Sequence, residues 1–179
     1  AYGGSCFPKD TKGLVSVAEK YKTNLSIVKS VINSNHKRVI LLTKRVHNII
    51  GRNLENKKIS ILGVTFKPNT DDMRDSTSLK MIPYFCKRGA TVSYYDPSGE
   101  KEEFMKIKNC TYKNNIKENC INADLIIILT EWDEFKAIDF KRINKKKNLK
   151  IYDLRNLYSP EEMKKNKLKY YSVGRSNLN

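Results

Sequence analysis

A thiol, an ammonium group and a carboxylate lie within five residues near the start of the sequence. They are Cys6, Lys9 and Asp10 in the segment AYGGSCFPKD. A thiol is a strong nucleophile only as the thiolate, which a neighbouring cation or a helix amino terminus stabilises. Cys6 is therefore a candidate nucleophile. Asp10 has a second interpretation, as the residue that caps the first turn of a following helix.

A second charged group follows an apolar block, in the segment GVTFKPNTDDMRD. A dinucleotide fold binds phosphate at such a place, but this segment lacks the GxGxxG pattern and has only Gly63 for close backbone approach. Lys67 and Arg74 offer their positive charges to anionic groups instead. The alternative is that both cations pair with acidic residues of the same segment. Those residues are Asp71, Asp72 and Asp75.

The four cysteines show neither a metal-binding nor a disulfide pattern. They are Cys6, Cys86, Cys110 and Cys120, with no CxxC and no His or Cys nearby at the spacing of zinc ligands. We therefore expect no metal and a reducing, cytoplasmic location. No apolar run reaches the roughly 18 residues of a membrane span, and no segment resembles a signal peptide, so no membrane partner is expected.

The sequence is strongly basic. Lys plus Arg number 35 against 19 Asp plus Glu, which gives a formal net charge of +16. Such a charge attracts phosphate-bearing partners, although lysines that are scattered along the chain are also typical of solvated surfaces. No helix-turn-helix or RNA-binding signature is present, and aromatic residues are not interleaved with basic ones. We therefore expect no nucleic-acid partner.

The elements that must position the first group are helical. Residues 1–10 are predicted to form a loop, followed by a short helix from Thr11 to Lys22. From Asn24 to Ile50 the apolar residues recur at three- and four-residue steps, which predicts a long amphipathic helix that stops at Gly51. Its length of roughly 40 Å suits a connection between domains or subunits. Asn35, in the apolar stripe, is either a register device in a dimer or a hydrogen-bonded group at a domain junction.

From Lys57 onward, short apolar blocks alternate with helices. This pattern predicts an α/β fold in which the long central helix is followed by a doubly wound, mainly parallel, Rossmann-like sheet. The expected strands are Ile59–Val64, Thr91–Tyr95, Leu125–Leu129, Ile151–Leu154 and Tyr170–Val173, with a helix at Ser78–Lys87. Ligands of such sheets bind at the carboxyl ends of the strands. We therefore expect the chemistry in the loops after Val64, Tyr95, Leu129 and Leu154.

Five motifs occur in the order AYGGSCFPKD, GVTFKPNTDDMRD, YYDP, TEWDEF and YDLRNLY. Over essentially the whole chain they resemble the UDP-glucose/GDP-mannose dehydrogenase family, and within it the bacterial UDP-glucose 6-dehydrogenases. The resemblance implies a catalytic-cysteine loop and central helical dimerisation region at 1–52, and a Rossmann-like UDP-sugar-binding domain at 53–179. The amino-terminal NAD-binding domain of the family is expected to be absent, because no GxGxxG follows any strand.

The resemblance also implies roles for single residues. Cys6 takes the place of the catalytic thiolate, and Asp10 that of a carboxylate that positions or activates water. The implied substrate-binding residues are Tyr2, Gly3, Phe66, Lys67 and Arg155. Lys9 and Arg74 fall on positions that contact NAD from across the cleft, and the loop at Glu131 to Phe135 would line the nucleotide side of the substrate.

The implied reaction oxidises UDP-glucose to UDP-glucuronate by two successive hydride transfers to NAD, through a thiohemiacetal and a thioester on Cys6. The implied partners are UDP-glucose, a second copy of the chain bound through the central helix, and a separate amino-terminal NAD-binding polypeptide. Without that polypeptide we expect no turnover. The alternatives are a non-catalytic nucleotide-sugar-binding or dimerisation fragment, and a dehydrogenase fragment that acts on GDP-mannose or a UDP-N-acetylhexosamine.

Overall fold

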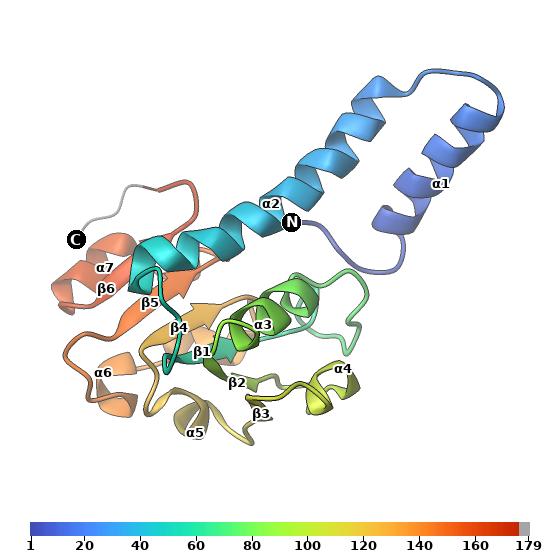
Figure 1. Ribbon diagram of the computed structural model, residues 1–179. Coiled ribbons are helices and arrows are strands. Elements are labelled where there is room, and N and C mark those ends of the chain that lie inside the picture. Colours follow the sequence, from blue (N-terminus) through green and yellow to red (C-terminus); the bar gives the residue numbers. More distant parts are fainter. Residues whose placement is uncertain (176–179) are drawn as a thin grey trace.

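The molecule consists of a helical arm and a layered α/β body (Figure 1). The computed structural model describes residues 1–175, so the last four residues of the expected 53–179 domain lie outside the described part. Helices α1 (Phe7–Lys20) and α2 (Ser26–Ile50) form a hairpin that projects from the body. The carboxyl-terminal half of α2 packs on the body and joins the two parts.

Helix α1 begins four residues earlier than the sequence predicted, at Phe7. Pro8 occupies the first turn, where a helix tolerates proline because the N–H groups there have no intrahelical acceptor. The predicted loop over residues 1–10 is therefore wrong from Phe7 onward. Asp10 is not the capping residue either, because Cys6 holds that position and its carbonyl accepts a hydrogen bond from the Asp10 N–H at 2.8 Å.

Helix α2 confirms the predicted long helix and its stop. Gly51 ends it with a φ of 106°, a conformation that favours glycine. The second half of the apolar stripe is buried against the body. Its buried apolar residues are Val39, Leu42, Val46 and Ile49. The first half lies on the arm, where Ile27 and Val31 remain exposed.

The body is built on a six-stranded parallel sheet in the order β3-β2-β1-β4-β5-β6. The strands are β1 (Lys58–Leu62), β2 (Thr91–Tyr95), β3 (Cys110–Tyr112), β4 (Leu125–Ile128), β5 (Lys150–Asp153) and β6 (Lys169–Ser172). This order is that of a doubly wound sheet whose direction of winding reverses between β1 and β4. The predicted fold class and its five strands are confirmed, whereas the edge strand β3 was not predicted.

Helices cover both faces of the sheet, and each face has its own apolar core. One core joins the sheet to α2, α3 (Ser78–Cys86) and α4 (Glu102–Met105). The other joins it to α5 (Ile116–Cys120), the 3-10 helix η1 (Asp133–Ala137), α6 (Phe140–Ile143) and α7 (Pro160–Lys165). Burial on both faces explains why the central strands are continuous apolar blocks.

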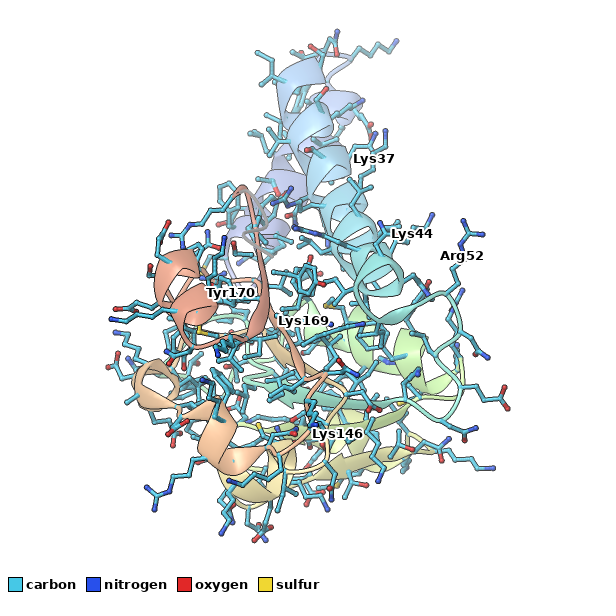
Figure 2. The ribbon with its side chains drawn as sticks, turned by 90° about the vertical axis from the view of Figure 1, so that its left-hand side faces the viewer. Lys37, Lys44, Arg52, Lys146, Lys169 and Tyr170 are labelled. Carbon is cyan, nitrogen blue, oxygen red and sulfur yellow. The ribbon has the colours of Figure 1, made fainter. Side chains whose placement is uncertain are left out.

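The positive charge is spread over the arm and the body. Lys37 and Lys44 point away from α2, and Arg52 extends from the segment after it (Figure 2). Lys146 and Lys169 belong to the body, and Lys146 pairs with Asp124 at 2.6 Å. Within residues 1–175, no helix combines the length and the apolar character that a membrane span requires.

Candidate functional site

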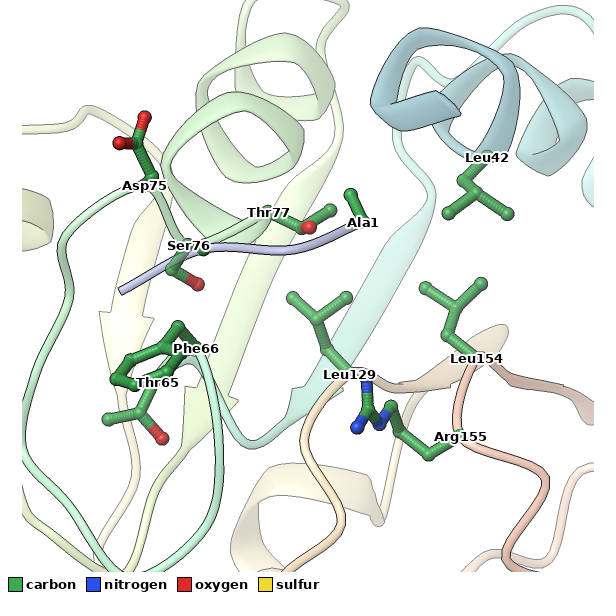
Figure 3. A pocket seen from close by; sticks show the side chains of 11 residues that line it. Ala1, Leu42, Thr65, Phe66, Asp75, Ser76, Thr77, Leu129, Leu154 and Arg155 are labelled. Carbon is green, nitrogen blue, oxygen red and sulfur yellow. The ribbon is translucent and has the colours of Figure 1, made fainter. Parts of the chain in front are cut away.

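A pocket opens at the carboxyl edge of the sheet, where β1, β4 and β5 end (Figure 3). Its lining residues are Ala1, Gly3, Leu42, Thr65, Phe66, Asp75, Ser76, Thr77, Leu129, Leu154 and Arg155. Three of the four predicted loops meet here, together with the opening segment and α2. The loop after Tyr95 does not line this pocket, and the expectation for that loop stays a prediction.

Hydrogen bonds at the backbone of Tyr2 and of Gly4 attach the opening segment to the rest of the site. The Gly4 N–H donates to the Arg74 carbonyl at 2.7 Å. The side-chain amide of Asn35 bonds both backbone groups of Tyr2, so its interpretation as a hydrogen-bonded group is confirmed, whereas its role as a register device in a dimer stays a prediction. The segment that carries Cys6 is therefore held by α2 and by the loop after β1.

Gly3 and Gly4 are required by close packing against that loop. A Cβ atom on Gly3 would lie 2.6 Å from the Asp75 carbonyl oxygen, and one on Gly4 would lie 2.6 Å from the Phe66 ring. Gly4 also has a φ of +87°. Phe66, a predicted substrate-binding residue, thus packs directly against the two glycines. Tyr2, another such residue, stacks edge to face on Phe7 with ring centroids 4.7 Å apart.

Cys6 is exposed at the start of α1. Its sulfur lies 3.4 Å from Ser5 Oγ. Lys9 and Asp10 follow it on the first turn and approach each other to 3.6 Å, both largely exposed. The pKa of Arg74 is raised, chiefly by its hydrogen bond to Asp72, and the negative charge of a Cys6 thiolate adds to this effect. Arg74 is therefore a cation close to the candidate nucleophile, contributed by the loop after β1.

The two predicted cations of that loop have different surroundings. Arg74 makes a two-pronged ion pair with Asp72, in which Nε and Nη2 donate at 2.9 and 2.8 Å. This hydrogen bond holds the pKa of Asp72 below its ordinary value. For Arg74, the interpretation as a partner of a neighbouring aspartate is confirmed. Lys67 is exposed, with its ammonium 5.5 Å from the centre of the Phe66 ring.

Arg155 extends into the pocket mouth from the end of β5 and is ion-paired with Glu131. Its backbone N–H donates to the carboxylate of the buried Asp153 at 2.9 Å. Within the described chain, Glu131 Oε2 and the indole N–H of Trp132 are buried without a hydrogen-bond partner. The TEWDEF and YDLRNLY segments therefore meet at this side of the pocket.

Asp96 organises the turn after β1, a role that the sequence reasoning missed. This buried carboxylate accepts hydrogen bonds from the N–H groups of Val64 at 2.7 Å, Thr65 at 3.3 Å and Ser98 at 3.0 Å. The hydroxyl of Ser76 donates to the Val64 carbonyl at 2.6 Å and adds a second contact that fixes this turn. The available signal was an aspartate at the carboxyl end of β2, in the YYDP motif.

The turn after β1 does not fit the pyrophosphate of a dinucleotide. Gly63 has a φ of +76°, and a Cβ atom there would lie 2.5 Å from Thr130 Cβ, so this glycine serves the packing of neighbouring strands. Thr65 and Phe66, the second and third residues after Gly63, place side chains where a glycine-rich turn would leave backbone N–H groups open. Among residues 1–175, no group of three His, Cys, Asp or Glu side chains is arranged to hold a metal ion.

Comparison with known protein families agrees with this arrangement, in which a helical segment that carries Cys6 precedes a parallel sheet. Residues 60–160 match the UDP binding domain of the UDP-glucose/GDP-mannose dehydrogenase family, and residues 1–37 match its central domain. The chain belongs to this family. The resemblance inferred from the five motifs is thereby confirmed.

Relatives within the UDP-glucose/GDP-mannose dehydrogenase family are longer than this chain. The UDP-glucose 6-dehydrogenase of Rhizobium meliloti is 39% identical over 175 residues, which cover 97% of this chain and 40% of the relative. That of Rickettsia prowazekii is 38% identical over 176 residues, covering 97% and 41%. The chain thus spans about two fifths of the length of the curated relatives it matches, and it corresponds to their carboxyl-terminal part.

Solved structures of the family have the same fold. A UDP-glucose dehydrogenase from Pyrobaculum islandicum matches with a TM-score of 0.82 and 25% identity, over 98% of this chain and 38% of that one. An NDP-N-acetyl-D-galactosaminuronic acid dehydrogenase from Methanosarcina mazei Go1 matches with the same TM-score and identity, over 99% and 39%. The family fold is therefore shared by enzymes named for different nucleotide sugars.

Proposed function

We propose that this chain contributes the nucleotide-sugar site and the nucleophile Cys6 of an NAD-dependent dehydrogenase that oxidises UDP-glucose to UDP-glucuronate. The observation that carries the proposal is the attachment of the Cys6 segment to the pocket. Gly3 lines the pocket, Gly4 bonds the loop after β1, and Cys6 follows two residues later at the start of α1. A sugar held in the pocket would have its reactive end near this thiol.

In the proposed chemistry, the Cys6 thiolate adds to the C6 aldehyde of the partly oxidised sugar and forms a thiohemiacetal. Oxidation of this adduct gives a thioester, and water then releases the carboxylate and regenerates the thiol. Cys6 lies at the amino terminus of α1, and Arg74 contributes a guanidinium nearby. Asp10 lies on the first turn of α1, from which we propose that it positions the water that attacks the thioester.

We propose that cations at the mouth of the pocket bind the diphosphate of UDP. Arg155 lines the pocket after the end of β5, and Lys67 is exposed directly after the lining residue Phe66 in the loop after β1. Phosphate groups attract both a lysine ammonium and an arginine guanidinium. Without ligand, Arg155 is ion-paired with Glu131, so binding of UDP would exchange this ion pair for one with phosphate. Phe66 contributes by holding Gly4, and Tyr2 by its place beside Gly3.

NAD would accept both hydrides. The turn after β1 does not fit a dinucleotide, so we propose that another domain of the dehydrogenase binds NAD and that Lys9 and Arg74 face it across the cleft. Both side chains are exposed, which this role requires. We also propose that two copies of the chain associate through the helical arm, whose side chains Leu14, Val17 and Ile27 are apolar and exposed.

A second candidate is a dehydrogenase for another nucleotide sugar. It is favoured by the equal TM-score of 0.82 to the Methanosarcina mazei structure, whose name gives an N-acetylated galactosaminuronic acid product. The two candidates share the nucleotide-binding mode and differ in the sugar. They are therefore separated by direct comparison of ligands on the same protein.

The test is calorimetric titration of the purified chain with UDP-glucose, GDP-mannose and UDP-N-acetylglucosamine. We expect saturable binding that is strongest for UDP-glucose. The Lys67→Ala and Arg155→Ala variants should bind about tenfold more weakly, because each loses a charged contact to phosphate. Lys108→Ala and Arg52→Ala are the matched controls, since both side chains are exposed and neither residue lies in a loop that lines the pocket, and they should bind like the unchanged chain.

Preference for UDP-N-acetylglucosamine with the same dependence on Lys67 and Arg155 would replace the first candidate by the second. If circular dichroism shows a folded chain that binds none of the three ligands, the pocket of this chain is not a nucleotide-sugar site by itself. That result would overturn the proposal in its present form.

A further inference from the structure

Two cysteines that the proposed reaction does not use face each other at the edge of the sheet. Cys86 is the last residue of α3, and Cys110 is the first residue of the edge strand β3. The Cys86 thiol lies 3.7 Å from the carbonyl oxygen of Asn109, the residue before Cys110. Both side chains belong to the same apolar core, with Cys86 buried in it and Cys110 packed against it.

The environment makes the two thiols unequal. Cys86 is buried, with 9% of its surface exposed, whereas Cys110 at the edge strand is partly exposed. The hydrogen bond from Cys110 lowers the pKa of Cys86. The pKa of Cys110 is raised, first by its hydrogen bond to Cys86 and then by burial. The thiolate is the form of a cysteine that reacts with oxidants, and a lowered pKa favours this form at Cys86.

We propose that Cys86 and Cys110 are a redox-sensitive pair that forms a reversible disulfide when a hydroperoxide reaches it. The Cys86 thiolate attacks one peroxide oxygen and becomes a sulfenic acid, and the other oxygen leaves as water or an alcohol. The Cys110 thiol then attacks the sulfenic sulfur, the S–S bond forms, and the sulfenic oxygen leaves as water. The two cysteines lose two electrons and two protons, which the peroxide takes up, and a dithiol reductant reverses the change.

The other two cysteines are not placed to compete for this bond. Cys120 is buried in the core on the opposite face of the sheet, 3.6 Å from Ser60 Oγ. Cys6 lies at the start of the helical arm. Cys86 and Cys110 border the other core, and the segment between them contains β2 and α4. A disulfide would tie the three-residue edge strand β3 to α3 and restrict the unfolded chain.

The test uses the full chain in a Cys6→Ser background, which removes the exposed thiol. The folded protein is treated with hydrogen peroxide, the remaining thiols are alkylated, and trypsin is added. We expect peptide 81–87 linked to peptide 109–113, with a mass lower by two hydrogen atoms than the sum of the two. The melting temperature should rise by roughly 5–10 °C and return after reduction with dithiothreitol.

Cys86→Ser and Cys110→Ser should each abolish the linked peptide and the rise in melting temperature. Cys120→Ser is the matched control and should keep both. Alkylation of Cys86 and Cys110 in the peroxide-treated protein, under conditions that oxidise a reference thiol peptide, would overturn the proposal. So would a linkage of either cysteine to Cys120, because that bond requires unfolding.

Discussion

The side-chain amide of Asn35 forms two hydrogen bonds with the backbone of Tyr2. Its Oδ1 accepts from the Tyr2 N–H and its Nδ2 donates to the Tyr2 carbonyl, both at 2.9 Å. Asn35 lies near the middle of α2, and Tyr2 lies four residues before the candidate nucleophile Cys6. The long helix therefore holds the segment that carries Cys6 directly.

Replacement of Asn35 by Leu should loosen this segment. Two hydrogen bonds are lost, so we expect a decrease of about 1–2 kcal/mol in the free energy of unfolding. Hydrogen exchange at residues 2–7 should become faster. Asn33→Leu is the control, because Asn33 is exposed on the same helix and its replacement should change neither quantity. Unchanged exchange in Asn35→Leu would show that the Gly4 contact alone holds the segment.

The two glycines Gly4 and Gly13 should respond to alanine in opposite directions. Gly4→Ala places a Cβ atom 2.6 Å from the Phe66 ring at a φ of +87°, so we expect a loss of about 1–3 kcal/mol. Gly13 lies within α1 with no atom within 4 Å of the added Cβ. Gly13→Ala should therefore stabilise the protein by about 0.5–1 kcal/mol. Urea unfolding measures both, and effects of the same sign would contradict the described packing of Gly4.

The ion pair between Asp72 and Arg74 should be visible as a shifted titration. The pKa of Asp72 is held below its ordinary value of 3.8, chiefly by the hydrogen bond from Arg74. Its contribution to stability is thus complete above the unfolded pKa and is lost as the pH falls below 3.8 through the folded pKa. Carboxyl NMR should give a midpoint below 3.8. Arg74→Ala should return it towards 3.8, whereas Lys67→Ala, the smallest of the lowering influences, should move it less.

Replacement of the Asp96 carboxylate by an amide should destabilise the protein. Both of its oxygens accept backbone N–H groups, so Asp96→Asn turns an NH2 group towards a buried donor. We expect a loss of about 1–3 kcal/mol in the free energy of unfolding, together with weaker binding of UDP-glucose as the turn that carries Lys67 relaxes. Asp133→Asn is the control, because Asp133 is exposed and should stay within about 0.5 kcal/mol of the unchanged chain. Equal stability of both variants would show that the turn does not depend on the Asp96 carboxylate.

The sequence was sufficient to predict the sheet because the central strands are apolar on both faces. Strands β1 and β4 therefore appear as unbroken apolar blocks between polar turns. Strand β3 escaped prediction because it has only three residues and none of them is fully buried. The start of α1 was misplaced because Pro8 was interpreted as the end of a loop, although proline is equally compatible with the first turn of a helix.

The candidate site was foreseeable in part. The sequence located the loops after β1, β4 and β5, because the parallel order of the sheet brings their carboxyl ends together, and it singled out Phe66 and Arg155. It did not foresee that Phe66 packs against Gly4, or that the Asp96 carboxylate fixes the turn after β1 by accepting its backbone N–H groups. These contacts join residues that lie some 30 to 60 positions apart, and no local pattern encodes them.

By itself the sequence determined the fold class, the long helix and the types of side chain available for chemistry, because periodicity and composition are local properties of the chain. Only the tertiary structure decided which partner each polar group has. Asn35 bonds Tyr2, Arg74 bonds Asp72, and the Cys86 thiol contacts the Asn109 carbonyl beside Cys110. A hydrogen bond depends on distance and direction within a few tenths of an ångström, and these are set only when separate elements pack against one another.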